Sequence, residues 1–311
     1  MTPKRIVFFG TPEFAVPILR SLYRETELVL VVTQPDRPSG RGRKMSPPPA
    51  KKAASELGIE VFQPNIVKGR RFSDRIAGYS PDFIVTAAFG RVLGPSLLDV
   101  PNADCLNVHA SILPKYRGAA PANWAVLNGD QESGISIMRM EKGLDTGPVF
   151  SITKTPVGSE ETAGELLARL SEIGAATIAE AIRRFDELEA IPQDHEHATW
   201  ARMLKKNDGV LDWTRSASDL HCHVRGMHPW PTANTRLRGE PIKAHAARVV
   251  SQSGKEGAPG LVLEVSDEGI DVACGEGVLR LVEVQAAGRK RLPVRLFLTG
   301  TRVESGFQLG E

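Results

Sequence analysis

The sequence contains few cysteines and no long apolar run, and both absences exclude classes of protein. The three cysteines, Cys105, Cys222 and Cys274, are widely separated and include no CxxC pair. Neither a disulfide framework nor a zinc site is therefore predicted, and free thiols in a reducing compartment are expected. The longest apolar run, Leu28 to Val32, is far shorter than the roughly 18 residues of a membrane span. No signal-peptide pattern follows Met1, so we expect a cytoplasmic protein without a membrane partner.

Composition and length favour a globular protein of two domains. Hydrophobic residues make up 41 % and charged residues 24 % of the 311 positions, close to the averages for soluble domains. This composition excludes a disordered or fibrous chain. The length is about twice that of a typical domain, which favours two domains. Lysine and arginine number 39 against 37 acidic residues, and this net charge of +2 does not by itself indicate a nucleic-acid partner.

Basic residues are nevertheless concentrated in three runs. The run Arg37 to Lys52 holds six basic residues and no acidic one, and Arg289 to Arg302 holds five basic residues and no acidic one. The run Lys68 to Arg75 holds four basic residues with Asp74 as its one acid. A single run of this kind is typical of a solvated face, but three runs in a weakly charged chain favour an anionic partner.

The N-terminal part of the chain predicts an α/β fold with a parallel sheet. Five strand-like runs are Arg5 to Phe9, Glu27 to Thr33, Asp82 to Ala87, Cys105 to His109 and Gly134 to Met140. Helical spacing separates several of these runs, and Ala163 to Leu188 carries a long helical pattern. Such alternation is typical of parallel strands joined by helical crossovers, whose chemistry lies beyond the carboxyl ends of the strands.

Beyond about Gly209 the pattern changes to short strand-like runs. They are Lys243 to Val250, Leu261 to Val265, Ile270 to Ala273 and Val278 to Val284, separated by turns that contain glycine. This spacing predicts a small antiparallel barrel. We therefore expect a first domain over residues 1–190, a linker over 191–208 and a second domain over 209–311.

Two motif-like segments are not expected to bind a cofactor or a metal. Gly10 follows the first strand, but the GxGxxG fingerprint of a dinucleotide site is absent, so Gly10 and Pro12 are expected to form a tight turn into a helix. His221, Cys222 and His223 are adjacent, but residues one and two apart on a helix do not face together. No metal is therefore predicted.

The segment from Cys105 to Gly118 points most clearly to chemistry. Asn107 and His109 are two residues apart on a predicted strand, so their side chains project to the same side at its carboxyl end. An asparagine amide can donate to a developing oxyanion, and a histidine can hold or take a proton near neutral pH. Asp145 follows the next strand-like run in a turn rich in glycine, and a carboxylate there would orient His109.

These residues lie in motifs that resemble the formyltransferases that use 10-formyltetrahydrofolate. The runs NVHASILPKYRGAAP (Asn107 to Pro121) and GISIMRMEKGLDTGP (Gly134 to Pro148) carry the resemblance, which extends over nearly the whole chain. The resemblance implies a Rossmann-like catalytic domain followed by a C-terminal OB-like β-barrel. It also implies that Asn107, His109 and Asp145 form the catalytic trio.

The resemblance further implies where the folate binds. Ser111, Ile112, Leu113 and Pro114 match the family's folate-binding SLLP segment, which reads SILP here. Phe89 and Gly90 stand where the family usually has Tyr-Gly. These six residues form the predicted folate site, and 10-formyltetrahydrofolate is the predicted formyl donor.

Other segments resemble the members of the family that act on methionyl initiator tRNA. They are the loop Thr33 to Ala54 and the later stretch Asp212 to Ala233. The residues expected to bind tRNA are Arg41, Arg43, Lys44, Lys205, Lys206, Arg289 and Lys290. Arg41 occupies the position of the family's loop arginine, and a barrel with basic residues is of a kind often used to hold nucleic-acid backbones.

The resulting hypothesis is that a monomer transfers a formyl group from 10-formyltetrahydrofolate to the α-amino group of methionyl initiator tRNA, for translation initiation. The amine would attack the formyl carbon directly through a tetrahedral intermediate, with Asn107 and His109 as oxyanion donors. The proton carrier is either His109 or a water held by Asp145. Two alternatives stay open: a folate enzyme that hydrolyses the formyl group or passes it to a small amine, and an RNA-binding protein on an enzyme-derived fold.

Overall fold

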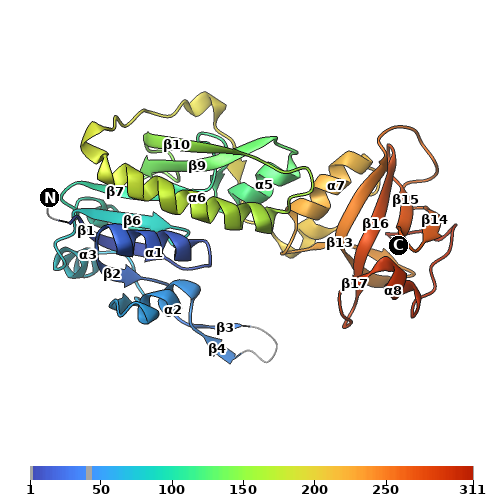
Figure 1. Ribbon diagram of the computed structural model, residues 1–311, viewed down its shortest axis with the longest axis horizontal. Coiled ribbons are helices and arrows are strands. Elements are labelled where there is room, and N and C mark those ends of the chain that lie inside the picture. Colours follow the sequence, from blue (N-terminus) through green and yellow to red (C-terminus); the bar gives the residue numbers. More distant parts are fainter. Residues whose placement is uncertain (1–2, 40–43, 311) are drawn as a thin grey trace. The chain divides into compact units, whose positions relative to one another are not determined.

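A seven-stranded sheet lies at the centre of the N-terminal part of the structure, a computed structural model that describes residues 3–39 and 44–310 (Figure 1). Its strands are β1 (Arg5–Gly10), β2 (Glu27–Val32), β5 (Val61–Phe62), β6 (Phe83–Ala87), β7 (Asp104–His109), β9 (Glu132–Arg139) and β10 (Val149–Pro156). They are ordered β10-β9-β7-β6-β1-β2-β5. The five predicted runs of this part of the chain are confirmed as strands of one sheet.

The sheet departs from purely parallel pairing at one edge. β7, β6, β1, β2 and β5 run parallel to one another. β9 runs antiparallel to β7, and β10 runs antiparallel to β9. No helix lies between β9 and β10, and strands joined by a short loop pair antiparallel because a parallel pair needs a longer crossover.

Helices cover both faces of this sheet. α1 (Ala15–Glu25) and α6 (Ala163–Arg183) pack together on one face, where the Ser21 hydroxyl donates to the Ala175 carbonyl at 2.9 Å (Figure 1). α3 (Arg70–Ala77) and α4 (Pro95–Leu98) lie on the other face. None of the helices in these described ranges has both the length and the apolar character that membrane crossing requires.

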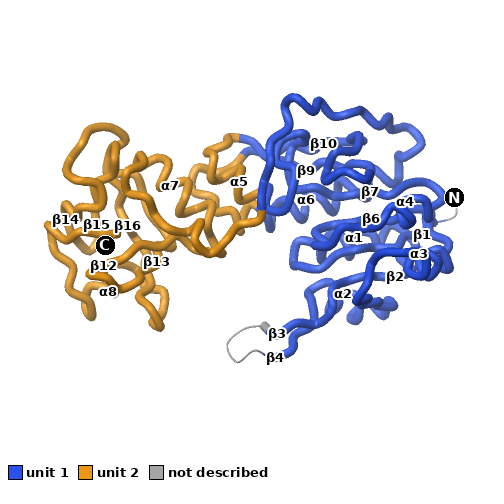
Figure 2. The backbone as a smooth tube through the Cα atoms, turned by 180° about the vertical axis from the view of Figure 1, so that it is seen from behind, with its two compact units in different colours: residues 1–121, 132–156, 167–202 blue, residues 122–131, 157–166, 203–311 orange. Residues whose placement is uncertain are grey.

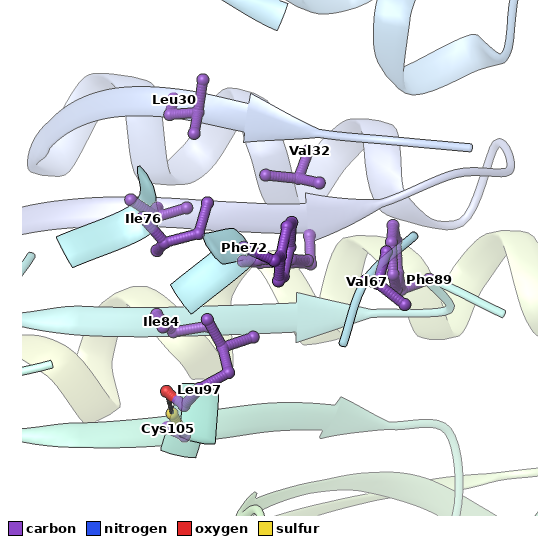
Figure 3. Close-up of a cluster of buried hydrophobic side chains, with 11 residues drawn as sticks. Leu30, Val32, Val67, Phe72, Ile76, Ile84, Phe89, Leu97 and Cys105 are labelled. Atoms are coloured by element: carbon purple, nitrogen blue, oxygen red, sulfur yellow. Dashed lines mark hydrogen bonds between the residues drawn. The ribbon is translucent and has the colours of Figure 1, made fainter. Parts of the chain in front are cut away.

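The core on the face of α3 and α4 is built from alternate residues of the strands. Successive strand residues point to opposite faces, so one face receives Val7 and Phe9 while Phe8 lies on the other. Figure 3 shows the resulting cluster, whose buried members are Val7, Phe9, Leu30, Val32, Val67, Phe72, Ile76, Ile84, Phe89, Leu97 and Cys105. This packing fixes the strand ends that carry the candidate site.

Smaller elements extend this framework. α2 (Pro49–Glu56) begins at a proline, whose fixed φ suits the first helical position. Ahead of it, β3 (Arg37–Ser39) and β4 (Lys44–Ser46) form an antiparallel hairpin. β8 (Arg117–Gly118) pairs in parallel with β11 (Trp200–Ala201).

Figure 2 colours the two compact units into which the chain divides. Unit 1 comprises Met1–Pro121, Glu132–Pro156 and Leu167–Arg202, and unit 2 comprises Ala122–Gln131, Val157–Leu166 and Met203–Glu311. Unit 1 contains the seven-stranded sheet. α5 (Pro121–Leu127) falls almost wholly in unit 2, and α6 begins in unit 2 and continues in unit 1.

Unit 2 contains a second, antiparallel sheet. The strands of this sheet are β12 (Ala233–Leu237), β13 (Glu240–Ser251), β14 (Val262–Ser266), β15 (Gly269–Ala273), β16 (Val278–Ala286) and β17 (Leu292–Pro293). The helices α7 (Ala217–Gly226) and α8 (Val294–Leu298) also belong to unit 2. The strand order is β12-β13-β16-β15-β14, and β17 also pairs with β16. The predicted antiparallel strands of the C-terminal part are confirmed, while its OB-like closure stays a prediction.

Replacing a core residue of the sheet should destabilise the protein. Ile84 on β6 is fully buried at 0 % exposure. Ile84→Ala should lower the free energy of unfolding by about 2–5 kcal/mol, because it removes buried methyl groups and leaves a cavity. Ile66→Ala is the matched control, since that side chain is 72 % exposed and a surface change should stay within about 0.5 kcal/mol. Urea unfolding followed by circular dichroism measures both, and equal losses would contradict the burial of Ile84.

Candidate active site

Asn107 and His109 lie at the carboxyl end of β7, beside Thr86 at the end of β6. The Thr86 hydroxyl donates to Asn107 Oδ1 at 2.7 Å. Because this bond engages the amide oxygen, the amide nitrogen is turned the other way, where Nδ2 lies 3.4 Å from Asp145 Oδ1. The structure therefore offers the N–H side of Asn107, the donor side, to the candidate site.

Asp145 reaches the same place from the loop between β9 and β10. Its Oδ2 accepts a hydrogen bond from the Gly118 backbone N–H at 2.9 Å and lies 3.7 Å from His109 Nδ1. β9 is antiparallel to β7, so its carboxyl end pairs with Leu106 and not with His109. The loop has to turn back to bring the carboxylate to the histidine, which the strand pattern alone does not reveal.

The hydrogen bonds of His109 fix which ring nitrogen carries a hydrogen. The imidazole is buried, and its Nε2 lies 2.9 Å from the Tyr116 carbonyl oxygen. A carbonyl oxygen only accepts, so Nε2 is the donor. In the neutral ring Nδ1 then holds the lone pair, and it is Nδ1 that faces Asp145. The site combines an amide donor, a proton-accepting nitrogen and a carboxylate, which suits attack on a carbonyl group.

The predicted folate residues occupy two places in unit 1. In the SILP segment Ser111 and Leu113 are buried, and their backbone groups contact the Ser136 hydroxyl at 2.7 and 3.1 Å. Ile112 and Pro114 are only half-buried and can contact a ligand. These buried positions hold the segment at the end of β7 through Ser136 of the neighbouring β9.

Phe89 and Gly90 follow β6. The Phe89 ring is buried in the hydrophobic cluster, 5.2 Å from the Phe9 ring centroid, and its carbonyl accepts from the Thr11 hydroxyl and the Gln34 amide. Gly90 has φ +78°, and a Cβ atom there would lie 2.5 Å from Gln34 Nε2. This backbone conformation favours a glycine, and a larger residue would also displace the Gln34 side chain.

The predicted tRNA-binding residues are distributed over both units. Arg41 and Arg43 lie outside the described residues. Lys44 is exposed on β4 in unit 1. Lys205, Lys206, Arg289 and Lys290 are exposed in unit 2, the first pair at a 3₁₀ turn and the second in the connection between β16 and β17.

Three further residues belong to this site: Thr86 and Gln193, which lie outside the motifs, and Gly118, which lies inside the motif Asn107 to Pro121 without a predicted role. Thr86 orients Asn107, and the Gly118 N–H holds the Asp145 carboxylate. Gln193 donates from Nε2 to the Asp145 carbonyl at 2.9 Å. Thr86 is a polar residue near the end of an apolar strand, which is a weak sequence signal for a functional position. The sequence gives no such signal for Gln193, because it lies 48 residues away from Asp145.

Among the residues that the structure describes, neither a reactive cysteine nor a metal cluster competes with this arrangement. The three cysteines are free, as expected from the sequence, and burial raises the pKa of the Cys105 thiol to about 12 and that of Cys274 to about 11. Across residues 3–39 and 44–310, no group of three or more His, Cys, Asp or Glu side chains is placed to hold a metal ion. Cys105 is therefore a core residue and not a nucleophile.

Alkylation tests this assignment of Cys105. With a pKa of about 12, the thiol is protonated at pH 8 and becomes reactive only as the pH rises toward that value. Iodoacetamide at pH 8 should leave Cys105 unmodified in the folded protein and modify it in guanidinium, as measured by peptide mass spectrometry. Fast modification of Cys105 in the folded protein would show a reactive thiol next to the site.

Comparison of this chain with known proteins identifies its family. The model of the family described as "Formyl transferase" matches residues 4–182, and that described as "Formyl transferase, C-terminal domain" matches residues 203–302. A methionyl-tRNA formyltransferase of Geobacter sulfurreducens is 48 % identical over 100 % of this chain and 98 % of its own length. One of Acetivibrio thermocellus is 44 % identical over 99 % of this chain and 100 % of its own length.

Solved structures share the fold at low sequence identity. An N-formyltransferase from Helicobacter canadensis, in complex with folinic acid and dTDP-3-aminofucose, has a TM-score of 0.65 at 17 % identity, covering 92 % of this chain and 100 % of its own. HypX from Aquifex aeolicus, in complex with tetrahydrofolic acid, has a TM-score of 0.62 at 17 % identity, covering 99 % of this chain and 51 % of its own. On the evidence of both domain matches and the full-length relatives, this chain belongs to the formyl transferase family.

Proposed function

We propose that this protein transfers the formyl group of 10-formyltetrahydrofolate to the α-amino group of methionyl initiator tRNA. The observation that carries the proposal is the convergence of Asn107, His109 and Asp145 at the carboxyl end of β7. Family membership and full-length relatives named methionyl-tRNA formyltransferase support the choice of donor and acceptor.

Asn107 is proposed to stabilise the oxyanion. Its amide nitrogen carries two hydrogens, and the contact with Asp145 Oδ1 at 3.4 Å uses at most one of them. The other is available to the formyl oxygen as negative charge develops there during attack by the amine. Since Thr86 already holds the amide oxygen, no rotation of the side chain is needed at that moment.

His109 is proposed to exchange the proton through Nδ1. Its Nε2–H is committed to the Tyr116 carbonyl, so Nδ1 is the atom that can accept a proton from the attacking amine and return it to the leaving nitrogen of the folate. Asp145 Oδ2, 3.7 Å from Nδ1, stabilises the imidazolium that forms. This assignment makes His109 the proton carrier and gives Asp145 an electrostatic role.

The donor is proposed to bind along the SILP segment and the turn after β6. This part of the chain fits an apolar ligand with a polar reacting end. The half-buried apolar residues Ile112 and Pro114 follow His109 within a few positions of the sequence. Ser111 and Leu113 support that segment from inside, and Phe89 and Gly90 would shape the opposite wall through their backbone. The folate supplies the formyl carbon, and the protein residues supply its orientation.

The acceptor tRNA is proposed to contact basic residues of both units. They are Arg41, Arg43 and Lys44 before α2, and Lys205, Lys206, Arg289 and Lys290 in the C-terminal part. In this proposal residues 1–190 carry the chemistry, 191–208 link the domains, and 209–311 form an OB-like tRNA-binding domain. We propose that the protein acts as a monomer, since unit 1 holds the trio and all predicted folate residues. We also propose that it acts in the cytoplasm, as its proposed translation substrate would require.

A single-turnover assay tests this function. The full chain is mixed with 10-formyltetrahydrofolate and either methionyl initiator tRNA or free methionine, and formylmethionine is measured. Fast formylation of the tRNA-borne methionine alone is the expected result. Formate release without an acceptor product would identify a hydrolase, and tRNA binding without turnover would identify an RNA-binding protein.

Removing any member of the trio should abolish most of the turnover. Asn107→Ala, His109→Ala and Asp145→Ala should each lower kcat by a factor on the order of 10²–10³, or roughly 2.7–4 kcal/mol, because each loses a group that acts on charge in the transition state. Thermal melting and circular dichroism check that each variant is folded. Turnover like that of the wild type in a folded variant would remove that residue from the mechanism.

Removing basic residues before α2 should weaken tRNA binding without changing folate binding. Arg41→Ala is expected to raise KM for methionyl tRNA and to reduce the salt dependence of binding. Each phosphate contact contributes about −0.9 on duplex, or about −0.7 on single strands, to the slope of the logarithm of the binding constant against the logarithm of the salt concentration. Arg24→Ala is the matched control, because it removes the same charge from an exposed position on α1. Equal effects of the two variants would contradict a specific contact by Arg41.

A further inference from the structure

The segment after α6, residues 191–201, lies along two loops of the candidate active site. At its start Ile191 exchanges two backbone hydrogen bonds with Val149, of 2.8 and 2.9 Å. At its end β11 pairs with β8, and the Thr199 hydroxyl accepts from the Tyr116 N–H at 2.9 Å. The segment is therefore fixed both to the strand that follows the Asp145 loop and to the residues that precede Gly118.

Gln193 joins these two loops through both ends of its side-chain amide. The side chain is buried, at 9 % residue exposure. Its Nε2 donates to the carbonyl oxygens of Asp145 and Gly147, at 2.9 and 2.7 Å. Its Oε1 accepts from Arg117 Nε and Nη2, at 3.1 and 2.7 Å. Both hydrogens and the oxygen of the Gln193 side-chain amide are thus used inside unit 1.

Arg117 determines which way this amide points. Its guanidinium is buried and has only donors, so it can face the amide oxygen of Gln193 and not the amide nitrogen. Arg117 Nη2, which donates to Gln193, also lies 2.8 Å from His195 Nδ1, so His195 helps to hold the guanidinium in place. The Gln193 NH₂ group is consequently directed at the Asp145 loop.

The loop that Gln193 holds carries a constrained backbone. Asp145 has φ +52°, in the left-handed region that residues other than glycine seldom adopt. Such a conformation persists where surrounding contacts determine it. The Asp145 carbonyl is held by Gln193, and its carboxylate by the Gly118 N–H, so both ends of the residue are fixed.

We propose that Gln193 is a positioning residue for formyl transfer. By holding the Asp145 backbone, it keeps the carboxylate beside His109 Nδ1 and Asn107 Nδ2, and Arg117 orients the glutamine for this task. Gln193 touches neither the donor nor the acceptor and acts only through Asp145. This inference rests on the proposed function for its catalytic consequence, while the holding of the loop can be measured without it.

The first test replaces the amide by a group of the same size. Gln193→Glu keeps an oxygen for Arg117 but turns a carboxylate oxygen toward the two carbonyls, so both donors to the Asp145 loop are lost. kcat should fall by up to about 10²-fold, the effect of a reacting group displaced by about 1 Å, with KM for both substrates unchanged. Glu196→Gln is the matched control, an exposed carboxylate-to-amide exchange in the same segment that should leave kcat unchanged.

A shorter amide provides a second variant. Gln193→Asn retains the chemical groups but is one methylene too short to reach Arg117 and both carbonyls together. It should also lower kcat at constant KM. If Gln193→Glu does not show a cooperative melting transition, and so is not folded, Gln193→Asn is used as the test variant in its place. Wild-type kcat in a folded variant of either kind overturns the proposal.

A double-mutant cycle separates positioning from a general structural role. If Gln193 acts only through the Asp145 carboxylate, Gln193→Glu should cause no further loss of kcat in the Asp145→Ala background. If the kcat losses of the two single variants multiply in the double variant, Gln193 affects the reaction by another route, and the proposal is overturned.

Amide hydrogen exchange distinguishes failure of this inference from failure of the proposed function. Residues 143–147 should exchange faster in Gln193→Glu than in the wild type, and equally in Glu196→Gln and the wild type. If the wild type formylates no acceptor but the exchange follows this pattern, the proposed function fails and the holding of the Asp145 loop stands. If the wild type formylates tRNA and neither kcat nor exchange changes in Gln193→Glu, the role of Gln193 is refuted and the function stands.

Discussion

The antiparallel pairing of β9 with β7 is the constraint on which the candidate active site depends. It brings the end of β9 beside Leu106, three residues before His109, so Asp145 can reach the histidine only on a loop that turns back. A loop held in one shape loses conformational freedom, and contacts from outside the loop have to offset that cost. The Gly118 N–H and the Gln193 amide supply such contacts, each from a different part of the chain.

The polar side chains of the site are satisfied in a way that leaves reactive atoms free. Burying an unpaired polar group is unfavourable, and His109 Nε2 and Asn107 Oδ1 both have partners within the protein. These bonds leave His109 Nδ1 and an Asn107 hydrogen for chemistry. Because the orientations are set in advance, little reorganisation is needed when charge develops in the transition state.

The proposed chemistry and the proposed recognition differ in how the chain encodes them. The trio lies within about 40 residues of sequence and entirely in unit 1. The basic residues proposed to bind tRNA are spread over both units. Contacts to remote parts of a large substrate can lower the barrier at the reacting atoms when they are realised in the transition state. In the proposed function, the basic residues of each unit would therefore affect the rate of formyl transfer as well as the affinity for tRNA.

The sequence by itself determined five of the seven strands of the N-terminal sheet, four of the six strands of the C-terminal sheet, and the identity of the candidate trio. Apolar runs such as Leu28 to Val32 can be read as buried strands because a short continuous apolar run is a local property of the sequence. The period of a strand also places Asn107 and His109 on one side, and motif resemblance adds Asp145. Only the tertiary structure decided the antiparallel edge, the return of the Asp145 loop, and the parts played by Thr86 and Gln193. The roles of Thr86 and Gln193 depend on hydrogen bonds between residues 21 and 48 positions apart, and no periodic pattern in the sequence records such contacts.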